Sequence, residues 1–182
     1  MVSLDNTSIT ECKYSEQADP GIKIIELEHI YNSNVQLSHD PFQPQKVSYF
    51  SLIYIEYGEG QHLIDGVQSP YQSGDVIFIN RGQHHAFDAA DSPKGKMVII
   101  TPTFFSECAA NIRYSYFVPF HLSLSYASVM HLEPYQSHNC NSMMNLISSN
   151  IAEQGADSIV VKLLFSAIVL RLTQLRSSQQ SG

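Results

Sequence analysis

Turn residues and short apolar segments alternate between Tyr57 and Phe87, and this alternation constrains the fold more than any other feature of the chain. Because glycine adopts positive φ angles without steric cost, Gly58 and Gly60 permit a tight turn between strands. Further turns are expected at 70–74 and 80–82. Three short strands are therefore expected, over residues 62–67, 76–79 and 84–87. Short strands at even spacing favour an antiparallel sheet that is closed or packed as a sandwich.

Flanking segments extend the predicted sheet. We expect further strands over residues 22–30, 47–57, 96–101 and 129–132. The segment 47–57 carries apolar side chains on both of its alternating faces, so we expect the barrel interior to cover one face and helices to cover the other. A short helix is expected at 103–107, where Pro102 suits the first turn.

The C-terminal third predicts two helices that pack antiparallel. We expect the first from Asn141 or Ser142 to about Glu153, with Gly155 ending it. The second should run from Asp157 or Ser158 to about Ser177. Ten of its twelve residues from 159 to 170 are apolar, so more than one of its faces needs a packing partner. We predict a two-fold contact with a second copy through the stripe Leu164, Ile168, Leu172 and Leu175. The alternative is that the helix is internal core.

Composition limits the functional classes. The 182 residues suffice for one sizeable core, and 43% of them are apolar, as in ordinary globular proteins. A net charge of −7 without clustered Lys or Arg predicts that the chain does not bind nucleic acid by itself. Cys12, Cys108 and Cys140 are widely spaced and odd in number, which suits free thiols in a reducing compartment. The polar N-terminus lacks a signal-peptide pattern, so a cytoplasmic location is expected.

Two overlapping motifs within residues 57–87 resemble patterns of known protein families. Gly74, Asn80, Gly82 and His85 match the second motif of the cupin superfamily, with Asn80 in place of the usual proline. A longer pattern resembles the N-terminal ligand-sensing domain of AraC-type transcription regulators. The residues that carry this resemblance are Gly58, Gly60, His62, Ile64, Asp65, Tyr71, Gly74, Asp75, Gly82, His85 and Phe87.

The resemblance implies a mostly β fold with a C-terminal α part, namely a cupin-like double-stranded β-helix (a jelly-roll barrel) followed by an antiparallel helix pair. The implied organisation has four segments: an N-terminal arm at 1–20, an effector-binding barrel at 21–135, a helical hairpin for dimerisation at 139–178, and the start of a linker at 179–182. In this family the linker leads to a DNA-binding domain, which we expect to lie outside this chain.

The implied function is to sense a small-molecule effector, with a homodimer formed through the helices, DNA bound only through that further domain, and no membrane contact. The family's ligand contacts fall near Tyr57, His85, Phe87 and Met97, and we add Tyr54 and His62 as candidates. Sugar-sensing members have an aromatic ring at the position of Met97 and a basic residue near Tyr57. Both are missing here, and the chain has no tryptophan, which argues against a sugar and leaves room for a less polar effector.

Catalysis and metal binding are the main alternatives. Metal-binding cupins use three histidines and one carboxylate, and those positions fall on Gly60, His62, Val67 and His85. Two ligands are therefore missing, so we expect no functional metal, no other cofactor and no catalytic residues. The rivals are a metal-dependent cupin enzyme, such as a dioxygenase or an isomerase, and a stand-alone small-molecule binding module. Metal analysis would identify the first, and a basic helical segment encoded after residue 182 would exclude the second.

Overall fold

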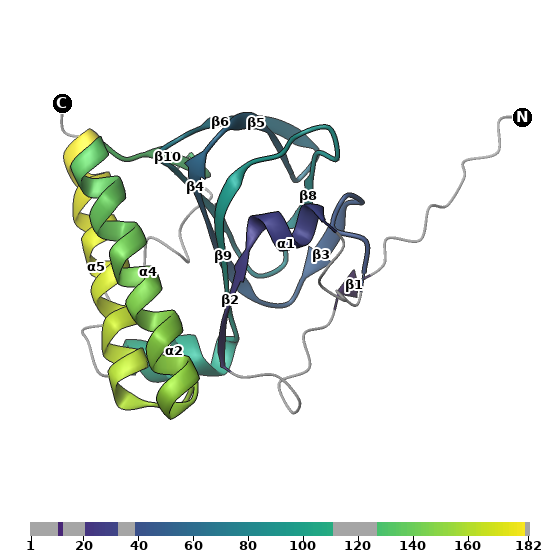
Figure 1. Ribbon diagram of the computed structural model, residues 1–182. Coiled ribbons are helices and arrows are strands. Elements are labelled where there is room, and N and C mark those ends of the chain that lie inside the picture. Colours follow the sequence, from purple (N-terminus) through teal and green to yellow (C-terminus); the bar gives the residue numbers. More distant parts are fainter. Residues whose placement is uncertain (1–10, 13–20, 33–38, 111–126, 181–182) are drawn as a thin grey trace, which may run out of the picture.

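A computed structural model describes residues 11–12, 21–32, 39–110 and 127–180 of the chain. In these residues, two five-stranded sheets lie face to face (Figure 1). The first sheet has the strand order β1 (Glu11–Cys12), β3 (Gln45–Val47), β8 (His84–Phe87), β5 (Glu59–Ile64) and β6 (Val67–Gln72). The second has the order β10 (Val129–His131), β7 (Asp75–Ile79), β4 (Phe50–Tyr57), β9 (Lys94–Ile100) and β2 (Ile22–Glu26).

Helices cover the outer side of the second sheet. Figure 1 shows α4 (Pro134–Gln154) and α5 (Ile159–Gln180) lying antiparallel against it, with α2 (Pro102–Ala110) packed near one end of α5. All pairings are antiparallel among the described strands except that of β1 with β3. The fold class expected from the sequence, a jelly-roll barrel followed by a helix pair, is confirmed.

Strand β4 shows how two cores arise from one sheet. Its side chains alternate, with Ile53 and Ile55 in the cluster between the sheets and Leu52 and Tyr54 in the cluster under the helices. Because successive side chains point to opposite faces, a strand buried on both sides must be apolar on both sides. This confirms the expectation that both faces of this segment are covered. We call the space between the two sheets the barrel interior.

A hairpin replaces the single strand that we expected over 62–67. Strand β5 ends at Ile64, the turn consists of Asp65 and Gly66, and β6 begins at Val67 in register with Ile64. Both turn residues have positive φ, 48° and 80°, as a two-residue type I′ turn requires. The turn expected over 70–74 is confirmed only at residues 73–74, because Pro70 lies inside β6 at the edge of its sheet, where proline is tolerated.

Two other predicted strands are shorter than expected. The segment 22–30 is a strand only to Glu26, after which α1 (Leu27–Tyr31) turns Leu27 and Ile30 into the barrel interior. The segment 47–57 is divided, because β3 pairs with β8 in the first sheet while β4 pairs with β7 and β9 in the second. The chain therefore changes sheets between Val47 and Phe50, as strands do at a barrel corner.

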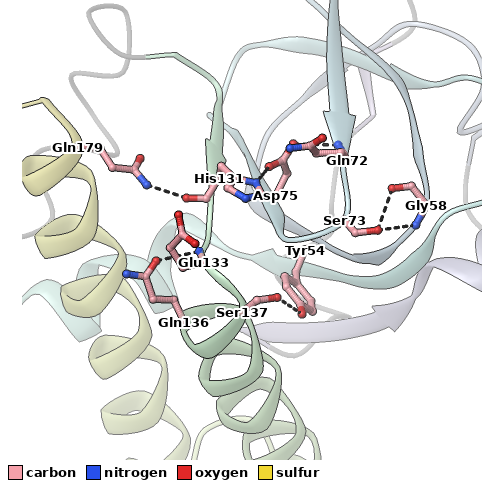
Figure 2. A network of polar contacts seen from close by, with 10 residues as sticks. All are labelled: Tyr54, Gly58, Gln72, Ser73, Asp75, His131, Glu133, Gln136, Ser137 and Gln179. Atoms are coloured by element: carbon pink, nitrogen blue, oxygen red, sulfur yellow. Dashed lines mark hydrogen bonds and ion pairs between the residues drawn. The ribbon is translucent and has the colours of Figure 1, made fainter.

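The first long helix begins before the predicted residues 141 or 142. It begins at Pro134, and Glu133 caps it in a capping box: the Glu133 side chain accepts from the Gln136 backbone, and Gln136 Oε1 accepts from Glu133 N at 3.1 Å. Figure 2 shows this cap beside the Tyr54 hydroxyl, which lies 2.7 Å from Ser137 Oγ on the first turn. Helix α4 ends before Gly155, as expected.

The second long helix extends to Gln180, so the linker expected at 179–182 does not begin where we placed it. Gln179 Nε2 donates to the carbonyl oxygen of His131 at 2.7 Å and holds the last turn against β10 (Figure 2). The expected N-terminal arm, except Glu11 and Cys12, and residues 181–182 lie outside the described residues.

The predicted dimer stripe requires a correction. Ile168, Leu172 and Leu175 are at most 9% exposed and belong to the core between the helices and the second sheet, and Leu164 is partly buried against the same core. These side chains are therefore used inside one copy of the chain. The exposed large apolar residues of α5 are instead Ile159, Val160 and Leu163, which we call the α5 patch.

Candidate functional site

Three buried polar side chains lie together on the inner face of the first sheet. Gln45 on β3 pairs directly with His85 on β8, and His85 pairs with Ile64 on β5. His62 is two residues from Ile64, so it faces the same side. Gln45 is 8% exposed, His85 is 5% exposed and His62 is fully buried. We call these three residues the polar patch.

The two imidazole rings of the polar patch are hydrogen bonded to each other. His62 Nε2 lies 3.0 Å from His85 Nδ1. Burial lowers the pKa of His62 well below its usual value, and the neighbouring His85 lowers it further. Burial, followed by the nearby His39, lowers the pKa of His85 to about 4. Both rings are therefore neutral at neutral pH, and one ring donates its single N–H to the other.

Aromatic and apolar side chains surround the polar patch. The Phe87 ring stands edge-on to the His62 ring at a centroid distance of 4.8 Å. Tyr31 from α1 contacts Phe87 in the same manner, at 5.9 Å. From the opposite sheet, Met97 joins the same apolar cluster as Phe87. The structure thus brings together four of the predicted ligand contacts, His62, His85, Phe87 and Met97, and their contact with a ligand stays a prediction.

Several buried polar atoms in the barrel interior have no hydrogen-bond partner. Among the residues that the structure describes, these atoms include Gln45 Oε1, His62 Nδ1 and His85 Nε2. An unpaired buried polar atom costs about 1–3 kcal/mol, so such atoms are normally satisfied by water or by a bound molecule. Their convergence in one interior marks this region as the candidate binding site.

Two predicted ligand contacts lie elsewhere. Tyr54 points away from the barrel interior into the core under the helices, where its hydroxyl bonds Ser137. Tyr57 is 62% exposed at the end of β4. It has the same parity as the inward Ile53 and Ile55, but the pairing of β4 with β9 shifts between Ile55 and Tyr57. Because of this irregularity, simple alternation does not predict which way Tyr57 points.

Sequence reasoning missed three residues of the interior. Gln45 lay between the strands predicted over 22–30 and 47–57, and Tyr31 lay just beyond the first of them. Tyr71 is part of the family pattern, but the pattern did not indicate its role. It is buried, and its hydroxyl donates to Asp91 Oδ2 at 2.9 Å, which links β6 to the loop after β8. The alternation around His85 indicates only that a residue beside it on a paired strand also faces inward. That this residue is Gln45 depends on the pairing of β3 with β8, which is non-local.

The residues present do not fit a cupin-type metal centre. Gly60 brings no ligand, and Val67 is 65% exposed on the edge strand β6. The remaining positions, His62 and His85, point ring nitrogens at each other in a hydrogen bond. In the described part of the chain, no three His, Cys, Asp or Glu side chains converge as a ligand set. We therefore assign no chemistry through a metal to this site.

A separate groove lies on the outer face of the first sheet. Its volume is about 290 Å³. Its lining residues are Phe42, Pro44, Leu63, Gln68, Ala86, Phe87, Asp88 and Ala89. Leu63 and Ala86 pair in register and alternate with the inward residues of β5 and β8, so they place the groove on the outer face, while its lining residues Phe42 and Phe87 also contact the interior cluster at its edge. None of the unpaired buried polar atoms named above lies on a residue that lines the groove. The barrel interior is the stronger candidate.

Comparison with models of known families identifies the family of this domain. The sequence model of the AraC-like ligand binding domain matches residues 34–172, which include the polar patch and most of the helix pair. The chain belongs to this family. The AraC-like domain is a ligand-binding domain by description, in agreement with an interior that holds unpaired polar atoms.

Several solved structures are similar to this AraC-like domain at low identity. ToxT from Vibrio cholerae O395 is 10% identical with a TM-score of 0.45, over 86% of this chain and 54% of that chain. The AraC-like transcriptional activator CuxR is 12% identical with a TM-score of 0.40, over 86% and 51%. A predicted oxalate decarboxylase from Thermotoga maritima is 30% identical over 30% of this chain and 49% of that chain, with a TM-score of 0.27.

The chain spans about half the length of these structures. A search of curated proteins found no match. Among the described helices, none has the length and apolar character needed to cross a membrane.

Proposed function

We propose that this AraC-like domain senses a small-molecule effector inside its barrel and belongs to a DNA-binding transcription regulator. The observation that carries the proposal is the set of unpaired polar atoms on His62, His85 and Gln45, which all lie in one interior walled by apolar side chains. Small-molecule sites have this composition, with a mostly apolar lining and a few placed polar groups.

DNA binding is proposed only for a part of the protein outside this chain. The net charge of −7 and the ten Lys and Arg residues give these 182 residues no electrostatic basis for contacts to phosphate. The effector would act on DNA binding by linkage, because a ligand shifts an equilibrium only as far as it binds one state better than the other.

Dimerisation is proposed through the helix pair, with a different face from the predicted stripe. On α5, Ile159, Val160 and Leu163 are 59%, 38% and 56% exposed, and they lie within about one turn of each other. Leu146 on α4 is also exposed, at 49%. A second copy of the chain is the proposed occupant, since a two-fold contact places the same apolar patch on both sides.

The effector proposal is tested by releasing bound small molecules from the native protein and identifying them by mass spectrometry. We expect one compound in a near-stoichiometric amount, and re-addition of it at 100 times its Kd should raise the free energy of unfolding by about 2.7 kcal/mol. The variant His62→Gln should lose the compound, whereas His138→Gln, on the exposed side of α4, should retain it. A compound retained equally by both variants would place the binding site outside the barrel interior.

A further inference from the structure

The hydrogen bond between His62 and His85 determines what their outer nitrogens offer to a ligand. Each neutral imidazole has one N–H and one nitrogen lone pair. If His62 Nε2 donates to His85 Nδ1, then His62 Nδ1 is left as an acceptor and His85 Nε2 as a donor. If the proton lies on His85 Nδ1 instead, the two outer roles are exchanged. In either arrangement the pair presents one free donor and one free acceptor.

The unpaired atom of Gln45 adds to this requirement. Gln45 Oε1 is a carbonyl oxygen and only accepts. Gln45 lies beside His85 by strand register, so its carbonyl belongs to the same patch as the imidazole pair. A ligand group that only accepts hydrogen bonds would leave the Gln45 carbonyl and one imidazole lone pair unsatisfied. Satisfying the patch therefore requires a ligand that also donates.

Charge in the interior gives a second constraint. Among the described residues, the buried cations lie on the helix side of the second sheet and not in the barrel interior. Lys96 Nζ bonds Asn141 on α4, and the Arg176 guanidinium lies 4.1 Å from the centre of the Phe78 ring under the helices. The inward residues opposite the polar patch carry no charge. Ser51 donates its hydroxyl to the Val98 carbonyl oxygen at 2.9 Å, and the others are apolar, namely Ile53, Ile55, Ile77, Ile79, Met97 and Ile99. Burial opposes protonation of His62 and His85, as their lowered pKa values show. An anion in this interior would therefore lack a counter-charge.

We propose that the polar patch of Gln45, His62 and His85 binds a neutral and mainly apolar effector through a group that both donates and accepts hydrogen bonds, such as a hydroxyl or an amide. This inference rests on the proposed effector site and assigns its ligand class. The polar group lies at the patch, and the apolar body extends toward the isoleucines and Met97 of the opposite sheet. Carboxylates and neutral esters are excluded, because they accept without donating.

A set of single-ring probes separates these properties. Benzamide and benzyl alcohol donate and accept, methyl benzoate accepts and is neutral, and benzoate accepts and is charged. Each probe is titrated into the whole chain labelled with nitrogen-15 in its histidine rings, and the ring signals of His62 and His85 are followed by NMR. We expect the first two probes to shift these signals and to bind about fivefold or more tightly than the other two. The free protein should show two neutral rings.

A pair of matched variants tests the role of the Gln45 carbonyl. Gln45→Leu removes the acceptor at similar volume, and it should reduce the preference for benzamide over methyl benzoate, because only the imidazole lone pair then remains to accept from the ligand. Gln72→Leu, on an exposed position of β6 outside the groove, should preserve the fivefold preference. If Gln45→Leu fails to fold, the order of the four probe affinities in the unmodified protein still tests the inference.

The outcomes distinguish this inference from the function on which it rests. If methyl benzoate or benzoate shifts the ring signals and binds as tightly as benzamide, the interior site stands and the assigned ligand class is wrong. If no probe shifts the rings of His62 and His85 up to its solubility limit, the barrel interior is not a binding site, and the proposed function fails together with the inference.

Discussion

The Tyr54 hydroxyl of strand β4 and the Ser137 hydroxyl of helix α4 lie 2.7 Å apart and join the barrel to its helix pair. Tyr54 is 2% exposed, so this polar contact lies within an otherwise apolar core. A buried hydroxyl needs such a partner, which is why a tyrosine predicted to contact ligand serves instead to fix the first turn of α4.

Removing this bond should reduce stability without affecting effector binding. We expect Tyr54→Phe to lower the free energy of unfolding by about 0.5–1.5 kcal/mol, because the ring keeps its packing while the hydroxyl bond is lost. Ser137→Ala should cost a similar amount, and the double variant should cost less than the sum of the two. Urea unfolding provides these values. Additive costs in the double variant would mean that the two hydroxyls do not interact.

Stability should fall as pH falls below 6.5. The folded-state pKa values of His62 and His85 lie below the unfolded value of about 6.5, so the unfolded chain takes up protons first. The stability linked to these rings is complete above pH 6.5 and is lost as pH falls toward 4, at about 1.4 kcal/mol per pH unit for each ring. Urea unfolding from pH 7.5 to 4.5 measures this slope.

A pair of histidine variants attributes this slope to the barrel interior. His85→Gln should flatten the pH dependence by about the contribution of one ring, whereas His138→Gln on the exposed face of α4 should not alter it. The comparison uses the slope, so it holds even if either variant changes the overall stability. An unchanged slope in His85→Gln would contradict a buried neutral His85.

Single substitutions on α5 should distinguish its exposed face, which is proposed to form the dimer, from its buried face, which stabilises the monomer. Leu163→Glu places a charge on the exposed α5 patch, and we expect it to convert the proposed dimer to monomer with little loss of monomer stability. Leu172→Ala opens a cavity in the core under the second sheet and should cost about 2–5 kcal/mol while the dimer persists. Analytical ultracentrifugation measures the mass. If the folded Leu172→Ala variant lost the dimer while Leu163→Glu kept it, the dimer interface would be the originally predicted stripe and not the α5 patch.

Alternation and turn chemistry were sufficient for most of the barrel. They predicted the strands that became β7 and β8 and the two covered faces of β4, because the period of two is a local property. The same local rule predicts that only one of the adjacent His84 and His85 faces inward, and the structure shows that it is His85, while His84 is half-buried.

The remaining features depend on pairings between distant residues. Gln45 meets His85 only because β3 pairs with β8, and Tyr31 reaches Phe87 from a helix that a run of apolar residues did not distinguish from a strand. The apolar stripe on α5 was visible in the sequence, but periodicity is the same whether a stripe packs on its own sheet or on a second copy. The exposure of Tyr57 could not be predicted from alternation, because the pairing of β4 with β9 is irregular between Ile55 and Tyr57.

The Asp65–Gly66 turn should tolerate some residues at position 66 and not others. Gly66 has a φ of 80°, and a Cβ there would meet no neighbouring atom, so only the backbone conformation opposes a side chain. We expect Gly66→Ala to cost about 1 kcal/mol and Gly66→Asn to cost less, since asparagine adopts this conformation more readily. Asp65 is held in place independently, because its carboxylate accepts from His84 N and from Gln83 Nε2. Thermal unfolding ranks the variants, and equal costs for alanine and asparagine would show that side-chain crowding, not the sign of φ, sets the preference for glycine.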